Sequence, residues 1–360
     1  MPGVRLPAEL WLQIGGNLPT RADLNRLVRT SHAFHSLLLP LLYRDIILSG
    51  PFGGATDQAE HLQAIRDNLE RIGAKAELVL AVRSCKLHKL EGALLEEVIT
   101  FLGTLPNLSG LFLDDLTLEA DQLIRLSKSW KSPVEFVSSF VRVKPIDLPP
   151  SIIKETPPKL SSLTVTSATL SQTSWRLFIQ WSFSADLETL HFRNNPETLF
   201  NALFQEHIGV LPKSSFPRLK SLYLPRLPIQ THQERFFGCM PMLENLYLIP
   251  ETYFPRSLKL SETPIPRLRR YEGPAINIPS LVPQRPIHHL SLYGEVPTIW
   301  GLHTSPVLNF GSTSAIRYLF CLSSIVDPLP SLQLISLLCP SLNELQLNNS
   351  STSHLSAVSP

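Results

Sequence analysis

The residues of this 360-residue chain that could do metal chemistry are isolated from one another. Cys85 and His88 are three residues apart, but no further metal-ligating side chain follows nearby, which argues against zinc. His288 and His289 are adjacent, and adjacent residues of a strand point to opposite faces, so their imidazoles do not converge on one ion. We therefore expect neither a metal site nor a bound cofactor.

Residue patterns typical of enzymes are also absent from the sequence. The stretch GPFGGATD (residues 50–57) is rich in glycine and precedes a helical pattern, but it lacks the lysine of a phosphate-binding loop. None of the motifs GxGxxG, GxxxxGK[ST], HExxH or GxSxG occurs. The sequence therefore predicts a protein without catalytic residues, whose function is binding.

Composition narrows the class of partner. The chain is 43% hydrophobic and carries a formal net charge of +2, a balance that gives no support for binding nucleic acid or an anionic membrane. The most apolar stretch, 37–48, is too short for a spanning helix, which needs roughly 20 residues, and the first residues lack a secretory-signal pattern. Four widely spaced cysteines indicate buried free thiols in a reducing compartment. We expect a cytoplasmic or nuclear location, or both.

A motif of the form Pro-x-Leu-x-x-Leu-x-apolar recurs along most of the chain. Clear copies are PNLSGLFL from Pro106, PKLSSLTV from Pro158, PRLKSLYL from Pro217, PMLENLYL from Pro241 and PSLNELQL from Pro340. PRLRRYEG from Pro266 is degenerate, and copies without the proline start at Leu187, Ile287 and Ile316. From Leu160 onward the first apolar position recurs every 19 to 32 residues. ELVLAV (77–82) is a candidate first copy, and another could lie near Val134.

Each copy predicts a strand with one buried face. Its last two leucines alternate with polar or aromatic residues, so they point to the same side. Apolar runs with helical spacing lie between copies, for example around Leu199 and Leu203 and around Leu334 and Leu338. The repeated proline separates helix from strand, because it cannot continue a helix. This accounts for part of an unusual proline content, 32 residues, against a usual share of about 5%.

Residues 75–350 thus resemble the leucine-rich repeat family, in its branch of irregular repeat lengths. The resemblance implies an α/β fold: a curved solenoid of parallel strands with helices on its convex side. An ordinary α/β domain with leucine-rich strands is the alternative. On the strand face away from the leucines, His191, Tyr223 and Tyr247 occupy the same position in three successive copies, with Arg193 two residues beyond the first. We expect this row to bind a partner protein, although tyrosine also suits a strand surface for packing alone.

The first 48 residues predict three short helices. Leu10, Ile14 and Leu18 form one apolar stripe, Thr20 with Asp23 predicts a cap for a second helix, and Ser31 predicts a cap for a third. Pro40 should bend or end that third helix. Three helices of this size cannot bury all their apolar faces on one another, so something else must cover the remainder.

This module resembles an F-box, and the trailing LPLLYRDIIL resembles the end of fungal F-boxes, where the chain enters its first strand. The resemblance implies that a Skp-type adaptor of a cullin–RING ubiquitin ligase covers the module. The residues at the family's spacing, expected to bind the adaptor, are Leu6, Pro7, Leu10, Ile14, Leu18, Leu24, Leu27, Val28 and Phe34. Of these, Leu10, Ile14 and Leu24 are expected at the centre of the interface.

The domain boundaries expected from these patterns are an F-box at 1–48, a linker and helix at 49–74, leucine-rich repeats at 75–350 and a polar tail at 351–360. The implied function is substrate recognition in a Skp–cullin–F-box ligase: the adaptor, and through it a cullin, binds the F-box, and a target protein binds the repeats. The alternative is a repeat scaffold whose N-terminal helices form a cap, since solenoids need shielded ends, without a role in ubiquitination.

Overall fold

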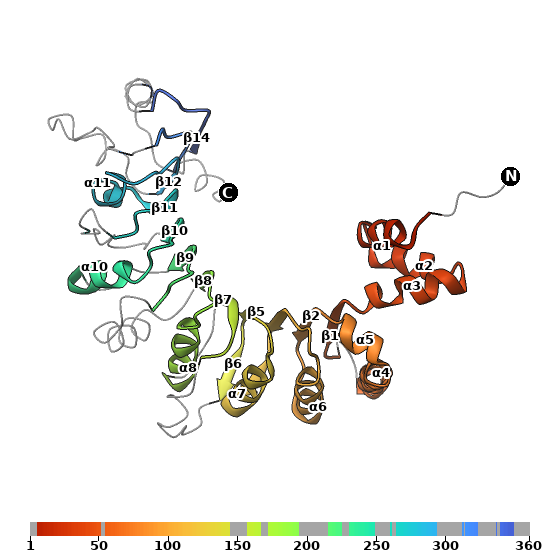
Figure 1. Ribbon diagram of the computed structural model, residues 1–360. Coiled ribbons are helices and arrows are strands. Elements are labelled where there is room, and N and C mark those ends of the chain that lie inside the picture. Colours follow the sequence, from red (N-terminus) through yellow and green to blue (C-terminus); the bar gives the residue numbers. More distant parts are fainter. Residues whose placement is uncertain are drawn as a thin grey trace, which may run out of the picture. The chain divides into compact units, whose positions relative to one another are not determined.

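The computed structural model describes residues 6–51, 55–144, 157–166, 172–193, 215–224, 230–248, 260, 264–293, 312, 314–322, 336 and 339–348. It is an α/β protein in which parallel strands alternate with helices (Figure 1). The chain divides into two compact units, one of Met1–Ser161 with Ala168–Ser174, the other of Ser162–Ser167 with Trp175–Pro360. The expected helices around Leu199 and Leu334, and the polar tail, lie outside the described residues.

The first unit opens with α1 (Ala8–Gly16), α2 (Arg21–Val28) and α3 (His32–Leu42). The predicted caps are present: the Thr20 hydroxyl accepts from the backbone N–H of Asp23 at 3.1 Å, and the Ser31 hydroxyl accepts from that of Phe34 at 3.2 Å. Both caps replace hydrogen bonds that the first helical turn cannot make internally. Pro40 lies inside α3, which continues for two residues beyond it.

The three helices share a small core of their own. Leu24, Val28 and Leu38 are its buried members, and partly buried side chains pack around them, including Leu18, Leu27 and Phe34. Trp11 of α1 meets Phe34 of α3 edge to face, with ring centroids 4.6 Å apart. At Gly15 an added Cβ would lie 3.1 Å from the Leu38 side chain and 3.2 Å from that of Leu41. Glycine there allows α1 to pack closely on α3.

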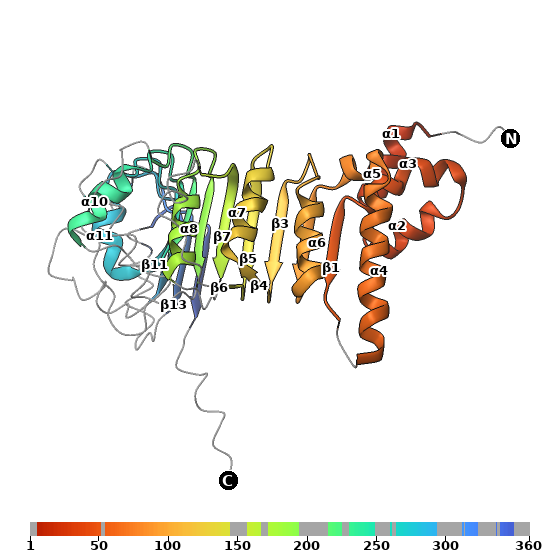
Figure 2. The ribbon, with the colours of Figure 1, turned by 90° about the horizontal axis from the view of Figure 1, so that it is seen from below.

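Strands and helices then alternate to the end of the first unit. In chain order they are β1 (Asp45–Ser49), α4 (Ala55–Gly73), α5 (Ala76–Ala81), β2 (Ser84–His88), α6 (Gly92–Leu102), β3 (Gly110–Asp114), β4 (Thr117–Glu119), α7 (Ala120–Ser129), β5 (Val134–Ser139) and β6 (Arg142–Lys144). The strands β1, β2, β3 and β5 pair in that order, all parallel, and β4 pairs with β6. Helices α4, α6 and α7 lie on the same side of these strands (Figure 2).

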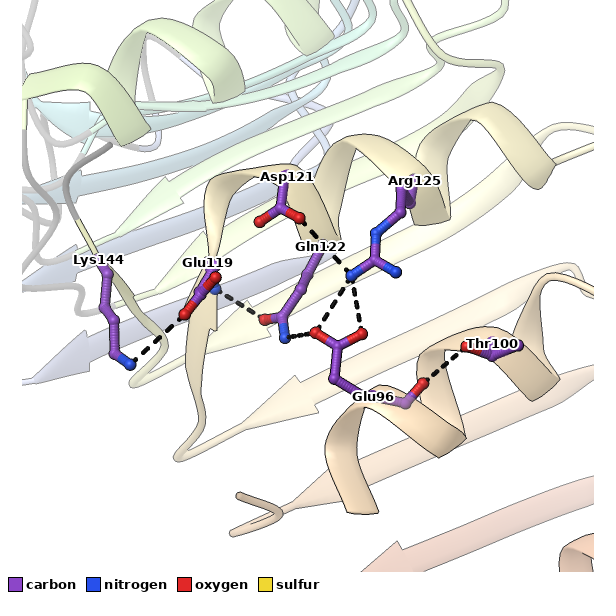
Figure 3. A network of polar contacts seen from close by, with 7 residues as sticks. All are labelled: Glu96, Thr100, Glu119, Asp121, Gln122, Arg125 and Lys144. Carbon is purple, nitrogen blue, oxygen red and sulfur yellow. Dashed lines mark hydrogen bonds and ion pairs between the residues drawn. The ribbon is translucent and has the colours of Figure 1, made fainter. Parts of the chain in front are cut away.

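Polar contacts join the outer helices α6 and α7 (Figure 3). The Glu96 carboxylate accepts from Arg125 Nη2 at 2.8 Å and from the amide of Gln122, and both contacts lower the pKa of Glu96. Gln122 Oε1 in turn accepts from the backbone N–H of Glu119 at 2.7 Å, which completes a capping box at the start of α7. Because these side chains are largely exposed, the ion pairs contribute little stability and mainly fix the helix register.

The second unit continues the alternation. It contains most of β7 (Leu160–Thr166) and α8 (Gln172–Ser182), then β8 (Thr189–Arg193), β9 (Ser221–Leu224), α10 (Gln230–Gly238), β10 (Asn245–Leu248), β11 (Arg270–Pro274), the 3₁₀ turn η2 (Ala275–Asn277), α11 (Ile278–Leu281), β12 (His289–Tyr293), β13 (Tyr318–Leu322) and β14 (Glu344–Asn348). Each strand from β7 to β14 pairs in parallel with the next. Figure 1 shows α8, α10 and α11 on one side of these strands; we name the other side, on which Tyr223 and Tyr247 lie, the tyrosine face.

The strand phase predicted from the motif is confirmed. Leu222 and Leu246 are fully buried, whereas Tyr223 and Tyr247, one residue further, lie half-buried on the tyrosine face. Every quoted copy from Pro106 onward lies on a strand, and β5 confirms the copy expected near Val134.

The candidate first copy at 77–82 is wrong. Residues 76–81 form α5, in which Leu78 is buried and Leu80 is 52% exposed. Alanine, glutamate and leucine all favour helix, and α5 contacts α3 and α4, which favours the helical alternative here. The strand that follows β1 is β2, which the motif search missed because only one leucine, Leu87, alternates with polar residues there.

The degenerate copy has a local explanation. Tyr271 stands where other copies have leucine and is fully buried on the side of the helices. Its hydroxyl donates to the carbonyl of Pro274 at 2.8 Å and accepts from Asn277 Nδ2 at 3.0 Å, so the buried hydroxyl is paired. At Gly273 an added Cβ would lie 2.6 Å from that hydroxyl, so glycine replaces the second leucine to make room for the tyrosine.

Candidate interaction surfaces

The N-terminal module leaves an apolar stripe of α1 exposed. Leu6, just before the helix, and Leu10 and Ile14 within it are 38%, 42% and 40% exposed. The four-residue spacing puts them on one side of the helix; we name these three residues the α1 stripe. Pro7 beside them is also exposed. Exposed apolar side chains grouped in this way are typical of a protein-binding surface.

Other residues expected to bind an adaptor lie inside the module. Leu24 and Val28 are 6% and 2% exposed and belong to its core, so the expectation that Leu24 is at the centre of a binding surface is wrong. Leu18, Leu27 and Phe34 are half-buried against that core. The physical reason is that α2 turns its apolar side toward α3, where burial on Leu38 removes it from water. These side chains hold the module together beneath the exposed stripe.

On the tyrosine face of the second unit, His191, Tyr223 and Tyr247 form a continuous stack of rings. They are partners in register on the neighbouring strands β8, β9 and β10. The ring centroids of His191 and Tyr223 are 4.4 Å apart, and those of Tyr223 and Tyr247 are 3.8 Å apart with the planes nearly parallel. We name these three residues the ring row. The sequence-based expectation that the rings lie side by side is confirmed.

The stacking decides which atoms of the ring row a partner could touch. Each interior ring face is covered by the next ring, so the row presents ring edges rather than faces. Burial raises the pKa of the Tyr223 hydroxyl, and burial together with Arg193 lowers the pKa of His191. Near neutral pH the row therefore offers neutral hydroxyl and imidazole groups, with the exposed guanidinium of Arg193 at one end.

Sequence reasoning missed a continuation of this surface on β11 to β13. The Arg270 guanidinium lies 5.2 Å from the centroid of the Tyr247 ring and 3.5 Å from a Glu272 oxygen. Glu272 also accepts from the Tyr293 hydroxyl, and His289 stacks on Tyr318 with centroids 3.9 Å apart. These residues occupy the positions before or after the buried pair, as the ring row does. The degenerate copy at β11 hid that register in the sequence.

A second missed feature is a cavity of about 280 Å³ at the C-terminal end of α1. Its lining includes Gly16, Arg21, Arg44 and Ile47, none of which the sequence singled out. The available signal was Ile47 alone, an apolar residue at a strand position that faces away from the buried ones.

The isolated chemical groups lie as follows. Cys85 is fully buried, and His88, on the opposite face of β2, has its Nδ1 3.2 Å from an Asp114 oxygen. His288 is exposed and His289 stacks on Tyr318. Across the described residues, no three histidine, cysteine or acidic side chains are grouped so that they could hold a metal ion. Nor does any described helix have the length and apolarity to cross a membrane.

Comparison with known proteins adds no assignment. No protein-family model matches the chain, and no curated protein matches it either.

Proposed function

We propose that this protein is a substrate-recognition subunit of a Skp–cullin–F-box ubiquitin ligase, acting in the cytoplasm or nucleus. The N-terminal helices are an F-box that binds a Skp-type adaptor, and the strands that follow are leucine-rich repeats that bind a target protein. The observation that carries the proposal is the α1 stripe: three apolar side chains about 40% exposed, on a helix whose module already has a buried core.

In this proposal the chain contributes no catalytic residue and no cofactor. It holds a target near the ubiquitin-bearing enzyme, and the rate gain comes from the raised local concentration of target lysines. Such a role needs two separate binding surfaces. The α1 stripe, in the first unit, serves the adaptor, and the ring row, in the second, serves the target. Tyrosine and arginine are among the side chains that most often anchor protein interfaces, which supports the second assignment.

One contact favours the alternative in which the helices only cap the strands. Arg21 of α2 donates to the carbonyls of Leu42 at 2.6 Å and Asp45 at 3.1 Å, so the module is bonded to β1. A cap would make such contacts. It would not, however, need the α1 stripe to be exposed, because uncovered leucine and isoleucine forgo the benefit of burial.

The deciding experiment mixes the purified full-length chain with a purified Skp-type adaptor and measures the mass of the product by size-exclusion chromatography with light scattering. We expect a stable one-to-one complex. Failure to bind at micromolar concentrations of both proteins would favour the cap, and the chain would then be a scaffold without a role in ubiquitination.

A further inference from the structure

The cavity at the end of α1 is built from elements of the first unit alone. Its wall runs from the last turn of α1 through the following loop to the start of α2, the end of α3 and the strand β1. A cavity of roughly 150 Å³ in another protein takes a benzene ring. About 280 Å³ therefore accommodates a large apolar side chain.

The lining is apolar where such a side chain would lie. Leu18, Leu41 and Leu42 contribute to it from the helices, and Ile47 contributes from β1. Ile47 is 62% exposed, the highest value among the large apolar residues that the structure describes. A β-branched side chain left this open on a strand gains from a partner that covers it.

The two glycines that end α1 differ in what requires them. Gly15 is needed for close packing, because an added Cβ would press on Leu38 and Leu41. Gly16 is not, because an added Cβ there meets nothing within 4 Å. Its backbone is not in the left-handed region either, and alanine would favour the helix more. What Gly16 does provide is open space at the cavity wall.

The charged groups at the cavity differ in how they are engaged. Arg21 is committed to the carbonyls of Leu42 and Asp45, and the Asp45 carboxylate accepts from the Ser84 hydroxyl at 2.5 Å. Arg44 is exposed, and within the described part of the chain its guanidinium makes no hydrogen bond or ion pair. The uncommitted charge is positive, which complements a partner that carries a carboxylate beside its apolar side chain.

The cavity also continues the proposed adaptor surface, because Ile14 of the α1 stripe directly precedes Gly15 and Gly16. We propose that the cavity receives an apolar side chain of the Skp-type adaptor, with an acidic residue of the adaptor next to Arg44. The inference rests on the proposed function and adds to it a second contact, made to β1 as well as to the helices. Through that contact the adaptor would bind helices and first strand as one body.

A pair of substitutions at Gly16 tests the cavity. Gly16→Leu places a side chain where the adaptor's would lie, whereas Gly16→Ala leaves most of the space open, and neither disturbs the packing of the chain. In titration calorimetry of the full-length chain with a purified Skp-type adaptor, we expect Gly16→Leu to weaken binding at least tenfold and Gly16→Ala to stay within twofold. Circular dichroism should show unchanged helix content for both.

Charge reversal tests the acidic neighbour. Arg44→Glu should weaken adaptor binding several-fold at low ionic strength and reduce the dependence of the affinity on salt, because an attractive pair is replaced by a repulsive one. Arg44→Ala should have an intermediate effect.

Thiol reactivity locates the contact directly. The four native cysteines are buried, and burial raises the pKa of Cys85 and of Cys321 to about 12, so they react slowly with iodoacetamide. In Ile47→Cys the new thiol is accessible, and saturating adaptor should slow its alkylation at least tenfold. Ile276→Cys, at a 47% exposed position of the second unit, is the control and should react at the same rate with and without adaptor.

The outcomes separate this inference from the proposed function. Suppose that the adaptor binds the native chain, that Gly16→Leu binds equally well, and that adaptor leaves the thiol introduced by Ile47→Cys reactive. The cavity is then not part of the interface and the inference is overturned, while the proposed function stands. If the native chain does not bind the adaptor at all, both are overturned.

Discussion

At the scale of single residues, burial separates side chains that sequence alone treats as equivalent. Leu10 and Leu24 are both leucines at helical spacing in the same module, yet Leu10 is 42% exposed and Leu24 only 6%. Leu24 faces α3 and packs with Leu38 in the module core. Substitution of each should therefore affect a different property, binding for Leu10 and folding for Leu24.

Leu10→Asp should abolish adaptor binding and leave the thermal unfolding temperature nearly unchanged, because its charge remains in water. Leu24→Asp should unfold the helical module, because it buries an unpaired carboxylate. Leu12→Asp is the matched control: Leu12 is 38% exposed on another side of α1 and should keep adaptor binding. The measurements are circular dichroism melts and size-exclusion chromatography with adaptor. Unfolding by Leu10→Asp would show that Leu10 supports the fold.

His289 should make stability depend on pH. Burial, together with the nearby charge of Arg270, lowers the pKa of His289 to about 4. In the unfolded chain the histidine pKa is about 6.5. Between these values the unfolded state binds the extra proton, so the free energy of unfolding falls as pH drops from about 6.5 toward 4.

The test compares native protein with His289→Gln by urea denaturation at pH 7.0 and pH 5.5. We expect the native protein to lose more stability than the variant over this interval, and NMR titration to show that the His289 ring stays neutral at pH 5.5. An equal loss in both proteins would assign the pH dependence to other groups. His191, whose pKa is also lowered, is the first of these.

At the scale of elements, the strand is the unit that the repeated motif specifies. The leucines of β9 and β10 point toward the helices and the tyrosines between them point away, so neighbouring residues of one strand differ completely in burial. The helices contribute in another way. On α6 and α7, exposed ion pairs fix the register, while apolar residues such as Val98 and Leu123 form the core beneath.

Leu222→Asp should prevent cooperative folding of the second unit, because a fully buried position would receive a charge. Tyr223→Asp should leave it folded and cost about 1 to 3 kcal/mol, since two ring contacts worth about 0.5 to 1.5 kcal/mol each are lost. Urea denaturation followed by tryptophan fluorescence measures both. Equal destabilisation would mean that the two residues are equally buried, contrary to the observed strand phase.

At the scale of the whole molecule, the proposal assigns one binding surface to each unit. The α1 stripe and the cavity belong to the first unit, and the ring row with Arg270, Glu272 and His289 belongs to the second. Because no residue is shared between the two surfaces, each should be removable without loss of the other.

Replacement of His191, Tyr223 and Tyr247 together by alanine tests this separation. A target is first recovered by pull-down with the full-length chain and then titrated against both proteins. We expect at least a tenfold loss of target affinity, about 1.4 kcal/mol, with adaptor binding unchanged. Arg218→Ala, which removes an exposed ion pair with Asp186, is a control and should keep both activities. Unchanged target affinity in the triple variant would place the target surface elsewhere.

The sequence by itself determined the features that depend on near neighbours in the chain. Alternation with period two and the proline before each motif located the strands from β3 onward, and hydroxyl side chains at Thr20 and Ser31 located two helix starts. These signals are local, because a pleat or a helix cap is made within a few residues. The line of three rings followed from the same alternation.

Only the tertiary structure decided which apolar residues are covered and by what. Burial depends on all neighbours in space, so Leu24 could not be told from Leu10, and the helix at 76–81 could not be told from a strand, until α3, α4 and α5 were packed together. The cavity at Gly16 and the placement of Arg270 over Tyr247 likewise join residues that are distant in the chain. Such contacts are set by how the elements pack, which no single segment encodes.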